Sequence, residues 1–518
     1  MSKKTKSLMI LGTGSHVGKS LLTTAFCRIF VQEGFSVAPF KAQNMALNSA
    51  ATPDGLEIGR AQAMQAEAAR IVPTVDMNPI LIKPSSETGA QVIVRGKIWG
   101  QVTAQDYHRK RVEELFPLVV ESYENLAAKH DIIILEGAGS PAEINLKARD
   151  IVNMRMAKAA DAACLLVGDI DRGGVFASLY GTIELLDDDE KDLIRGFLIN
   201  KFRGDETLLT SGVQMICDKI GKPCAGVIHH LPDVGLDEED SVSLNATTDL
   251  SNEFYKSNFS PKRALRVGVI ALPYISNFTD FDALTAEKSI ALAFIKNAED
   301  VEKADVIIIP GSKQTIEDLR WLEANGFADA IKNHVRANKI TIGICGGMQM
   351  LGLGIYDVAG LEGGGNVEGM GLLPIRTNLN GEKITVPVTG EVRTPKIFGG
   401  ELSCTKISGY EIHLGETIYE TDCKPFAHVF RHTNQSQNIA DGATSSDGKT
   451  IGTYLHGLFD ADDFRHAFIN AARKSVGIEA SNELNFYRAG REARIDRLAA
   501  HVRRAVNLDL IYDWLGLK

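Results

Sequence analysis

Residues Ile342–Leu351 read IGICGGMQML, an apolar run that ends at a glycine-flanked cysteine and continues into helix-forming residues. This pattern is typical of a nucleophile elbow, a sharp strand-to-helix turn that holds one exposed side chain in a strained backbone conformation. Small neighbours let a substrate carbonyl group approach, and the N-terminus of the following helix favours the thiolate. We therefore expect Cys345 to act as a nucleophile.

A second signature lies near the start of the chain, where residues Gly12–Ser20 read GTGSHVGKS after a short apolar run. Such a loop presents backbone N–H groups to phosphate oxygens, a lysine to the terminal phosphates and a hydroxyl group to Mg²⁺. It has five residues, not the common four, between its first glycine and the glycine before the lysine. The expected ATP contacts in it are Gly12, Thr13, Gly14, Ser15, Gly18, Lys19 and Ser20.

The bulk composition limits the class of protein. The 518 residues are 44% hydrophobic and 24% charged, which indicates a globular chain of two or three domains. The net charge of −10, without a basic tract, argues against nucleic-acid and anionic-membrane partners. Seven dispersed cysteines without metal-ligand spacing indicate reduced thiols. With no run long enough for a signal peptide core or a membrane span, we expect a cytoplasmic protein.

Short apolar runs alternate with amphipathic segments, which is typical of α/β folds with parallel sheets. The first half has such runs at Leu8–Leu11, Val37–Phe40, Ile132–Leu135, Cys164–Val167, Phe197–Asn200 and Ala225–Ile228, and a helix from Lys19 to about Val31. The second half has them at Arg266–Leu272, Asp305–Pro310, Ile340–Ile344 and Ile451–Leu455. We predict an ATP-binding domain at 1–232, a linker at 233–263, a second parallel-sheet domain at 264–462 and a helical extension at 463–518.

Three stretches depart from this alternation. Residues Leu361–Gly371 and Thr377–Gly400 are rich in glycine and β-formers, and predict loops and an antiparallel excursion. In Arg488–Leu508 the apolar residues recur at helical spacing with arginines on the other face. We interpret this last segment as a packing helix.

Polar side chains follow several predicted strands of the first half, at the sheet edge where α/β proteins bind ligands. Glu136 is expected, with Ser20, to hold Mg²⁺. Lys41 and Asn200 are expected to contact ATP. The expected substrate contacts are Gln43, Asn44, Asp171 and Arg172.

A cysteine nucleophile needs a base, and His456 is the best placed because it ends an apolar strand and precedes a glycine. His413 is the other histidine of interest. Gly311 follows another apolar strand, so its N–H and that of Gly346 could stabilise an oxyanion.

These motifs resemble known families. The segments around Cys345 and His456 look like class I glutamine amidotransferases of the cobyrinate-amidating branch, which have a flavodoxin-like fold. The first half resembles dethiobiotin synthetase-like ATP enzymes. The combination resembles the cobyric acid synthase family over essentially the whole chain. The residue strings that carry this last resemblance are Ala38–Asn48, Glu57–Gln62, Met77–Pro84, Asp169–Ala177 and Asn200–Asp205.

The resemblance implies an amidoligase of cobalamin biosynthesis. Its substrates would be ATP, L-glutamine and adenosylcobyrinic acid a,c-diamide, four of whose carboxylates (b, d, e and g) would be amidated through acyl phosphates. Many class I amidotransferases carry a glutamate two residues after the histidine, but here that position is Leu458. The third member of the triad is therefore missing or supplied from elsewhere.

Two alternatives remain open. One is the sister enzyme that amidates the a and c carboxylates of cobyrinic acid, which shares both domains. The other is a P-loop regulatory ATPase with a non-catalytic amidotransferase-like module, against which the intact Cys345 and His456 argue.

Overall fold

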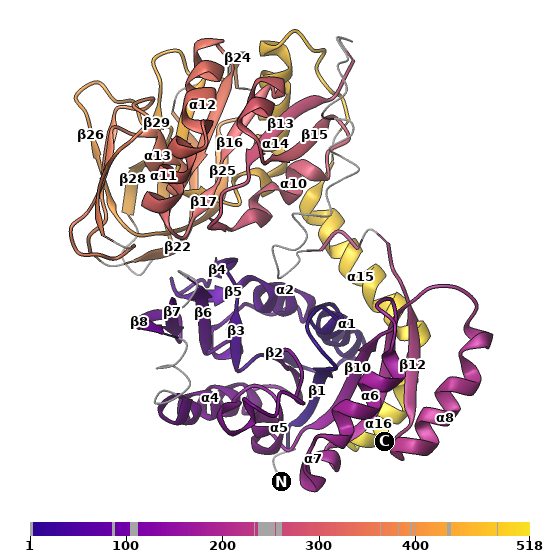
Figure 1. The fold of residues 1–518 in the computed structure, drawn as a ribbon. Helices are drawn as coiled ribbons and strands as arrows, with labels where there is room; N and C mark the ends of the chain where they lie inside the picture. The colour runs from indigo at the N-terminus through magenta and orange to yellow at the C-terminus, as the bar shows by residue number, and fades with distance from the viewer. Residues whose placement is uncertain are drawn as a thin grey trace. The chain divides into compact units, whose positions relative to one another are not determined.

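A computed structural model describes residues 4–517 except 85–88, 104–111, 233, 237–253, 255–261, 363, 382, 394–395, 399, 403, 433–436 and 484. The packing of the chain defines two compact units (Figure 1). The first unit comprises Met1–Ala46, Ile58–Glu239 and Arg491–Lys518, and the second comprises Leu47–Glu57 and Asp240–Gly490. Each unit is therefore discontinuous in sequence. The sequence-based domain boundaries stay a prediction, and most of the predicted linker lies outside the described residues.

The first unit is built on a parallel sheet of strand order β12-β11-β10-β1-β9-β2. Its strands are nearly continuous apolar runs because helices cover both faces of such a sheet. Their bounds are β1 Lys6–Gly12, β2 Val37–Phe40, β9 Ile132–Glu136, β10 Ala163–Asp169, β11 Ile194–Phe202 and β12 Cys224–His229.

The helices of this unit are α1 Lys19–Gln32, α2 Arg60–Ala68, α4 Val112–Ala127, α5 Met154–Ala159, α6 Val175–Glu184, α7 Asp188–Lys191, α8 Thr210–Ile220, α16 Leu508–Leu515 and α15 Tyr487–Ala505, whose first four residues belong to the second unit. The unit also contains a smaller sheet of order β3-β6-β7-β8. Its strands are β3 Gln43–Met45, β6 Ile80–Pro84, β7 Gly89–Val94 and β8 Lys97–Thr103.

The end of the chain completes the core of the first unit. The apolar stripe of α15 is buried in the same cluster as α1 and β1, and α16 adds Ile511 and Leu515. In Figure 1 the yellow helix α16 lies beside the strands of this unit. The fully buried Arg28 of α1 pairs with Glu492 at 2.9 Å and Asp496 at 3.2 Å. The predicted packing helix is therefore confirmed.

The second unit has a central sheet of order β15-β13-β16-β18-β30-β29, parallel except for β29. Its strands are β13 Leu265–Ile270, β15 Ile290–Ile295, β16 Val306–Ile309, β18 Ile340–Ile344, β29 Ala443–Thr444 and β30 Thr450–Thr453. The helices are α10 Asp282–Thr285, α11 Thr315–Ala324, α12 Phe327–Arg336, α13 Gly346–Leu351 and α14 Asp462–Ser475.

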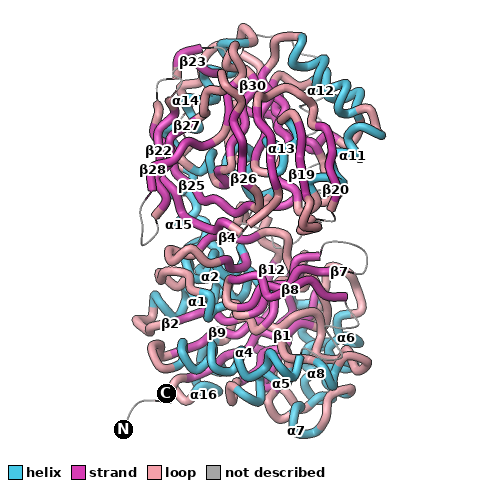
Figure 2. Tube along the Cα trace, turned by 90° about the vertical axis from the view of Figure 1, so that its left-hand side faces the viewer, coloured by secondary structure: helices cyan, strands magenta, loops and turns pink. Residues whose placement is uncertain are grey.

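Antiparallel strands extend this unit, as the glycine-rich stretches predict. Figure 2 shows β22, β25, β27 and β28 side by side, and β31 completes the sheet at the edge of β25. These strands are β22 Ile384–Val392, β25 Lys406–His413, β27 Ala427–Arg431, β28 Gln437–Asp441 and β31 Leu455–His456. A further sheet consists of β19 Gly354–Asp357, β20 Gly365–Glu368, β21 Ile375–Asn378 and β26 Glu416–Tyr419.

Short pairs of strands complete the second unit. They are β14 Ile275–Ser276 with β17 Gly311–Ser312, β23 Lys396–Ile397 with β24 Gly400–Glu401, and β4 Ser49–Ala51 with β5 Glu57–Gly59, whose last two residues belong to the first unit.

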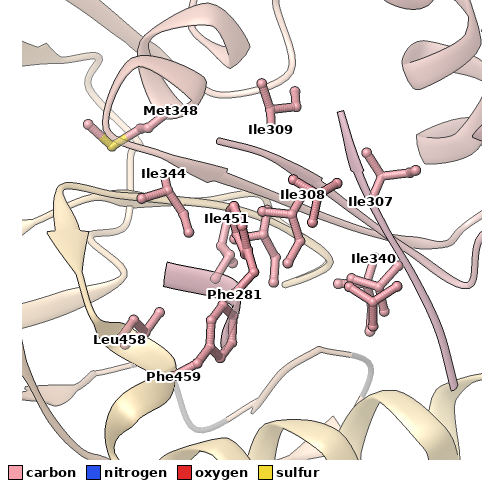
Figure 3. Packing of buried hydrophobic residues seen from close by; sticks show 14 of the residues in the cluster. Phe281, Ile307, Ile308, Ile309, Ile340, Ile344, Met348, Ile451, Leu458 and Phe459 are labelled. Carbon is pink, nitrogen blue, oxygen red and sulfur yellow. The ribbon is translucent and has the colours of Figure 1, made fainter. Parts of the chain in front are cut away.

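The core of the second unit lies against the central sheet (Figure 3). Isoleucines of β16 and β18 and Ile451 of β30 pack with Met348 of α13 and with Phe281 and Phe459. All the strands predicted for both units are present, and the predicted α/β class is confirmed.

We expect Leu498→Ala to lower the free energy of unfolding by about 2–5 kcal/mol, because it leaves a cavity in the first unit's core. Leu498 is buried on α15. The matched control is Leu208→Ala, because the Leu208 side chain is 82% exposed. Denaturation in urea, followed by circular dichroism, measures both variants. Equal stability of the two variants would contradict the placement of α15 in this core.

Candidate functional site

Cys345 stands at the turn between β18 and α13, with φ 52° and ψ −111°. A non-glycine residue at such a φ is strained, as in a nucleophile elbow. A Cβ atom at Gly347 would lie 2.0 Å from the Ile309 oxygen, so the helix needs glycine there to pack closely. The thiol is 8% exposed, and its sulfur lies 3.6 Å from the Ile412 oxygen of β25.

His456 lies beside this elbow and is fully buried. Its Nδ1 is 2.7 Å from Oδ2 of Asp280, which belongs to the short helix Phe278–Phe281. The other oxygen of Asp280 accepts a hydrogen bond from Gly457 N at 2.9 Å. Burial alone would lower the pKa of His456, but the charge and hydrogen bond of Asp280 raise it to about 10, with a smaller contribution from Cys345.

Asp280 is the residue that sequence reasoning missed. It stands where a carboxylate orients the ring in a Cys-His-acid triad, and position 458 instead holds a leucine buried in the core. The one available signal was the acidic end of the segment Asn277–Asp280, which matches no motif by itself.

The two glycines expected to form an oxyanion hole also lie next to the thiol site. A Cβ atom at Gly311 would lie 3.1 Å from Cε1 of His456. One at Gly346 would lie 3.0 Å from the Ser312 nitrogen. The structure brings both backbones together with Cys345, so their N–H groups remain our candidates for oxyanion donors.

A cavity of about 350 Å³ is lined by Glu411 and His413, the two neighbours of Ile412, whose oxygen contacts the Cys345 sulfur. Its lining includes Glu411, His413, Arg431, Asp441 and Tyr454. Glu411 Oε2 is 2.6 Å from Arg431 Nη2, whereas the buried Oε1 has no hydrogen-bond partner among the described residues. Burial would raise the pKa of Glu411, but His413 and Arg431 bring it below its ordinary value.

His413 and Asp441 also affect the charge of that cavity. The ring of His413 stacks on Tyr454 at 3.7 Å, and burial lowers the pKa of His413, which keeps the ring neutral. Burial and the charge of Glu411 raise the pKa of Asp441 to about 7. The cavity therefore combines the carboxyl groups of Glu411, Glu416 and Asp441 with the Arg431 guanidinium and neutral polar groups.

The phosphate-binding loop of the first unit runs from β1 into α1. The Lys19 ammonium donates hydrogen bonds to the Gly14 oxygen at 2.8 Å and the Gly139 oxygen at 3.0 Å. Gly18 has φ 100°, a conformation that favours glycine. Asn200, at the end of β11, donates from Nδ2 to the Val17 oxygen at 2.8 Å, so its amide holds the loop.

Glu136 gathers polar side chains at the end of β9. Its Oε1 accepts hydrogen bonds from Ser20 at 2.8 Å and from the Lys41 ammonium at 2.9 Å. Its Oε2 accepts one from Gln65 of α2 at 2.6 Å. The structure thus unites the predicted Ser20, Glu136 and Lys41, and adds Gln65, which sequence reasoning did not single out.

The predicted substrate residues fall into two groups. Gln43 and Asn44 lie on β3, where Asn44 is buried and donates to Gln62 Oε1 at 3.0 Å. Asp171 and Arg172 lie on the loop after β10. The two pairs of residues therefore lie on separate elements of the first unit.

Asp171 accepts a hydrogen bond from Arg203 at 3.1 Å. The Arg172 guanidinium, 65% exposed, lies 3.9 Å from Asp169. In the described part of the chain, no group of three or more His, Cys, Asp or Glu side chains could hold a metal ion. Nor does any described helix have the length and apolar character to cross a membrane.

Comparison with known proteins gives two family matches. Residues 266–464 match the CobB/CobQ-like glutamine amidotransferase domain, and residues 8–244 match the CobQ/CobB/MinD/ParA nucleotide binding domain. A protein of Syntrophobacter fumaroxidans named cobyric acid synthase is 44% identical over 523 residues, which cover 100% of both chains. The chain belongs to the cobyric acid synthase family. The resemblance on which the sequence interpretation depends is confirmed.

A second relative agrees with this membership, and the chain also aligns in part with a solved structure. The cobyric acid synthase of Moorella thermoacetica is 45% identical over 514 residues, covering 99% of this chain and 98% of its own. A crystal structure of a glutamine amidotransferase aligns with 40% of this chain and 98% of its own, at 17% identity and a TM-score of 0.29.

The phosphate-loop residues lie in the matched nucleotide-binding domain, and Cys345 and His456 lie in the matched amidotransferase domain. Asp280 lies within the matched range of the amidotransferase domain. Cys345, His456 and Asp280 therefore all lie within one matched domain.

We expect Asp280→Asn to move the alkylation profile of Cys345 to higher pH and to slow alkylation at neutral pH roughly tenfold or more. Without the carboxylate, the pKa of His456 falls and the imidazolium that stabilises the thiolate is lost. Iodoacetamide labelling with peptide mass spectrometry measures this reactivity. Asp463→Asn, an exposed change on α14, serves as the control. An unchanged profile would show that Asp280 does not act on the ring.

Proposed function

We propose that this protein is a glutamine-hydrolysing amidoligase of cobalamin biosynthesis. It amidates the b, d, e and g carboxylates of adenosylcobyrinic acid a,c-diamide at the expense of ATP. The observation that carries the proposal is the presence of a Cys345–His456–Asp280 triad and a Lys19 phosphate loop in one chain that matches cobyric acid synthases over its full length.

The glutaminase step follows from the triad. His456 takes the proton of Cys345 at Nε2, and the thiolate attacks the carboxamide carbon of glutamine. The N–H groups of Gly311 and Gly346 stabilise the oxyanion of the tetrahedral intermediate. His456 returns the proton to the leaving nitrogen, which departs as ammonia, and water then hydrolyses the thioester to release glutamate.

The cavity beside the triad supports a place for the amino-acid end of glutamine. The free oxygen of Glu411 is a buried acceptor that suits the α-ammonium group. Arg431 supplies a cation for the α-carboxylate. This charge pattern selects a free amino acid over an uncharged amide.

The ligase step uses the first unit. A carboxylate is a poor electrophile, so transfer of the γ-phosphoryl group of ATP converts it into an acyl phosphate, which ammonia attacks with loss of phosphate. Lys19 offsets the charge of the phosphates. The hydroxyl of Ser20 and the carboxylate of Glu136 form an oxygen donor set that suits Mg²⁺, whose charge would stabilise the phosphates. Use of ATP supports a cytoplasmic location.

The test is the mass of the corrinoid after incubation with ATP, Mg²⁺ and glutamine. With the wild-type protein, we expect the corrinoid to gain four amide groups. Cys345→Ala should give no product from glutamine but the same product from free ammonia. Lys19→Ala should retain glutamine hydrolysis and leave the corrinoid unchanged.

The two alternative functions predict different results in these assays. A gain of two amides on cobyrinic acid would favour the sister enzyme that acts on the a and c carboxylates. Absence of Cys345-dependent ammonia release would favour a regulatory ATPase with a non-catalytic module.

We expect Glu411→Gln to raise the KM for glutamine about tenfold or more, with kcat changed only a few-fold, because the α-ammonium group loses its buried anion. Steady-state glutaminase assays measure both constants. Glu323→Gln, an exposed change on α11, is the charge-matched control. A loss of kcat at unchanged KM would refute the assignment of Glu411 to substrate binding.

A further inference from the structure

A segment from the first half of the sequence belongs to the second unit. We call Leu47–Glu57 the arm. Phe278 N donates to Asn48 Oδ1 at 3.1 Å, and Ser49 N donates to Asn277 Oδ1 at 3.0 Å. The arm is closed by a hydrogen bond from Ser49 Oγ to Glu57 at 2.8 Å, and Glu57 forms an ion pair with Lys383 at 2.6 Å. The arm is therefore anchored beside the helix that carries Asp280.

Asn277 links the arm to the catalytic ring. It is buried, with φ 53°, and its Nδ2 lies 3.3 Å from His456 Nε2. A backbone N–H only donates, so the contact with Ser49 N identifies the Asn277 atom facing the arm as the oxygen. The amide N–H therefore points at Nε2.

This orientation restricts the protonation of His456. Nδ1 donates to Asp280, and the Asn277 N–H that faces Nε2 favours an unprotonated Nε2, so Asn277 opposes the effect of Asp280 on the pKa of the ring. Transfer of the Cys345 proton to Nε2 forms a thiolate and an imidazolium whose new N–H faces the N–H of Asn277. Two donors that face each other disfavour that ion pair.

We propose that the arm, through Ser49 and Asn277, restrains the glutaminase, and that its release activates Cys345. Once Ser49 N withdraws, the Asn277 amide can rotate and present Oδ1 to the protonated Nε2. The ion pair is then stabilised by a charge-assisted hydrogen bond. This inference rests on the proposed glutaminase function and assigns Asn277 as a positioning residue.

The flanks of the arm explain how the ligase could control this contact. Lys41 precedes the arm and Gln65 follows it, and both bind the carboxylate of Glu136 in the first unit. Mg²⁺ held by Ser20 and Glu136 would compete with Lys41 and Gln65 for the oxygens of Glu136. Because the arm lies between Lys41 and Gln65 in the sequence, a change at these two residues would act on Ser49 through the backbone.

Several titratable groups of the described residues surround His456. Asp280 and Cys345 contact or face its ring, Tyr410 stacks on it at 5.5 Å, and His413 acts on it electrostatically. None of these belongs to the arm. The arm therefore acts on the ring through Asn277.

The test is Asn277→Asp, an isosteric change that tolerates the same backbone conformation. Both carboxylate oxygens accept, so the variant keeps the contact with Ser49 N and also accepts from protonated Nε2. We expect glutamine hydrolysis without ATP or corrinoid to rise roughly ten- to hundredfold, and its stimulation by ATP and corrinoid to shrink. Alkylation of Cys345 should move to lower pH. Asn333→Asp, an exposed change on α12, is the control and should behave as wild type.

A second variant loosens the arm without touching the ring. Lys383→Met removes the ion pair with Glu57, and we expect it to raise basal hydrolysis in the wild-type background but not in combination with Asn277→Asp. A lower basal rate in Asn277→Asp, or an unchanged rate in Lys383→Met, would overturn the inference while leaving the glutaminase intact. A wild-type protein without Cys345-dependent hydrolysis would overturn the proposed function as well.

Discussion

The contact between Asp280 and His456 is the constraint on which the thiol site depends. Both side chains are almost wholly buried, and an unpaired charge at such a place costs several kcal/mol. The carboxylate therefore fixes the tautomer and the plane of the ring, and its second oxygen fixes the backbone at Gly457. Cys345, Gly311 and Asn277 can act on the ring as described only because Asp280 holds it in this position.

Glu136 plays the corresponding part in the first unit. It too is a buried carboxylate at a strand end, and its three hydrogen bonds come from α1, from the segment after β2 and from α2. A single anion thus draws together the phosphate loop and both flanks of the arm. In each unit a buried carboxylate, Glu136 or Asp280, accepts hydrogen bonds from several donors and so holds the surrounding segments in place.

The sequence predicted what is local. Apolar runs such as Ile132–Leu135 became strands because covered parallel strands need few polar residues, and the glycine-flanked Cys345 marked its own turn. Asp280 could not be found in this way, since its partner lies 176 positions later and no motif surrounds it. Gln65 meets Glu136 from 71 positions away. The discontinuity of both units also escaped prediction, because periodicity identifies an element but not the core it joins.

The core of the first unit has a consequence for protein synthesis. Strand β1 is translated long before α15 and α16, yet the cluster around it also contains Ile495, Leu498 and Ile511. The core of the first unit therefore cannot be completed until α15 and α16 have been translated, by which time the strands of the second unit are already made. During this interval the Arg28 guanidinium on α1 lacks the carboxylates of Glu492 and Asp496, with which it pairs in the folded unit.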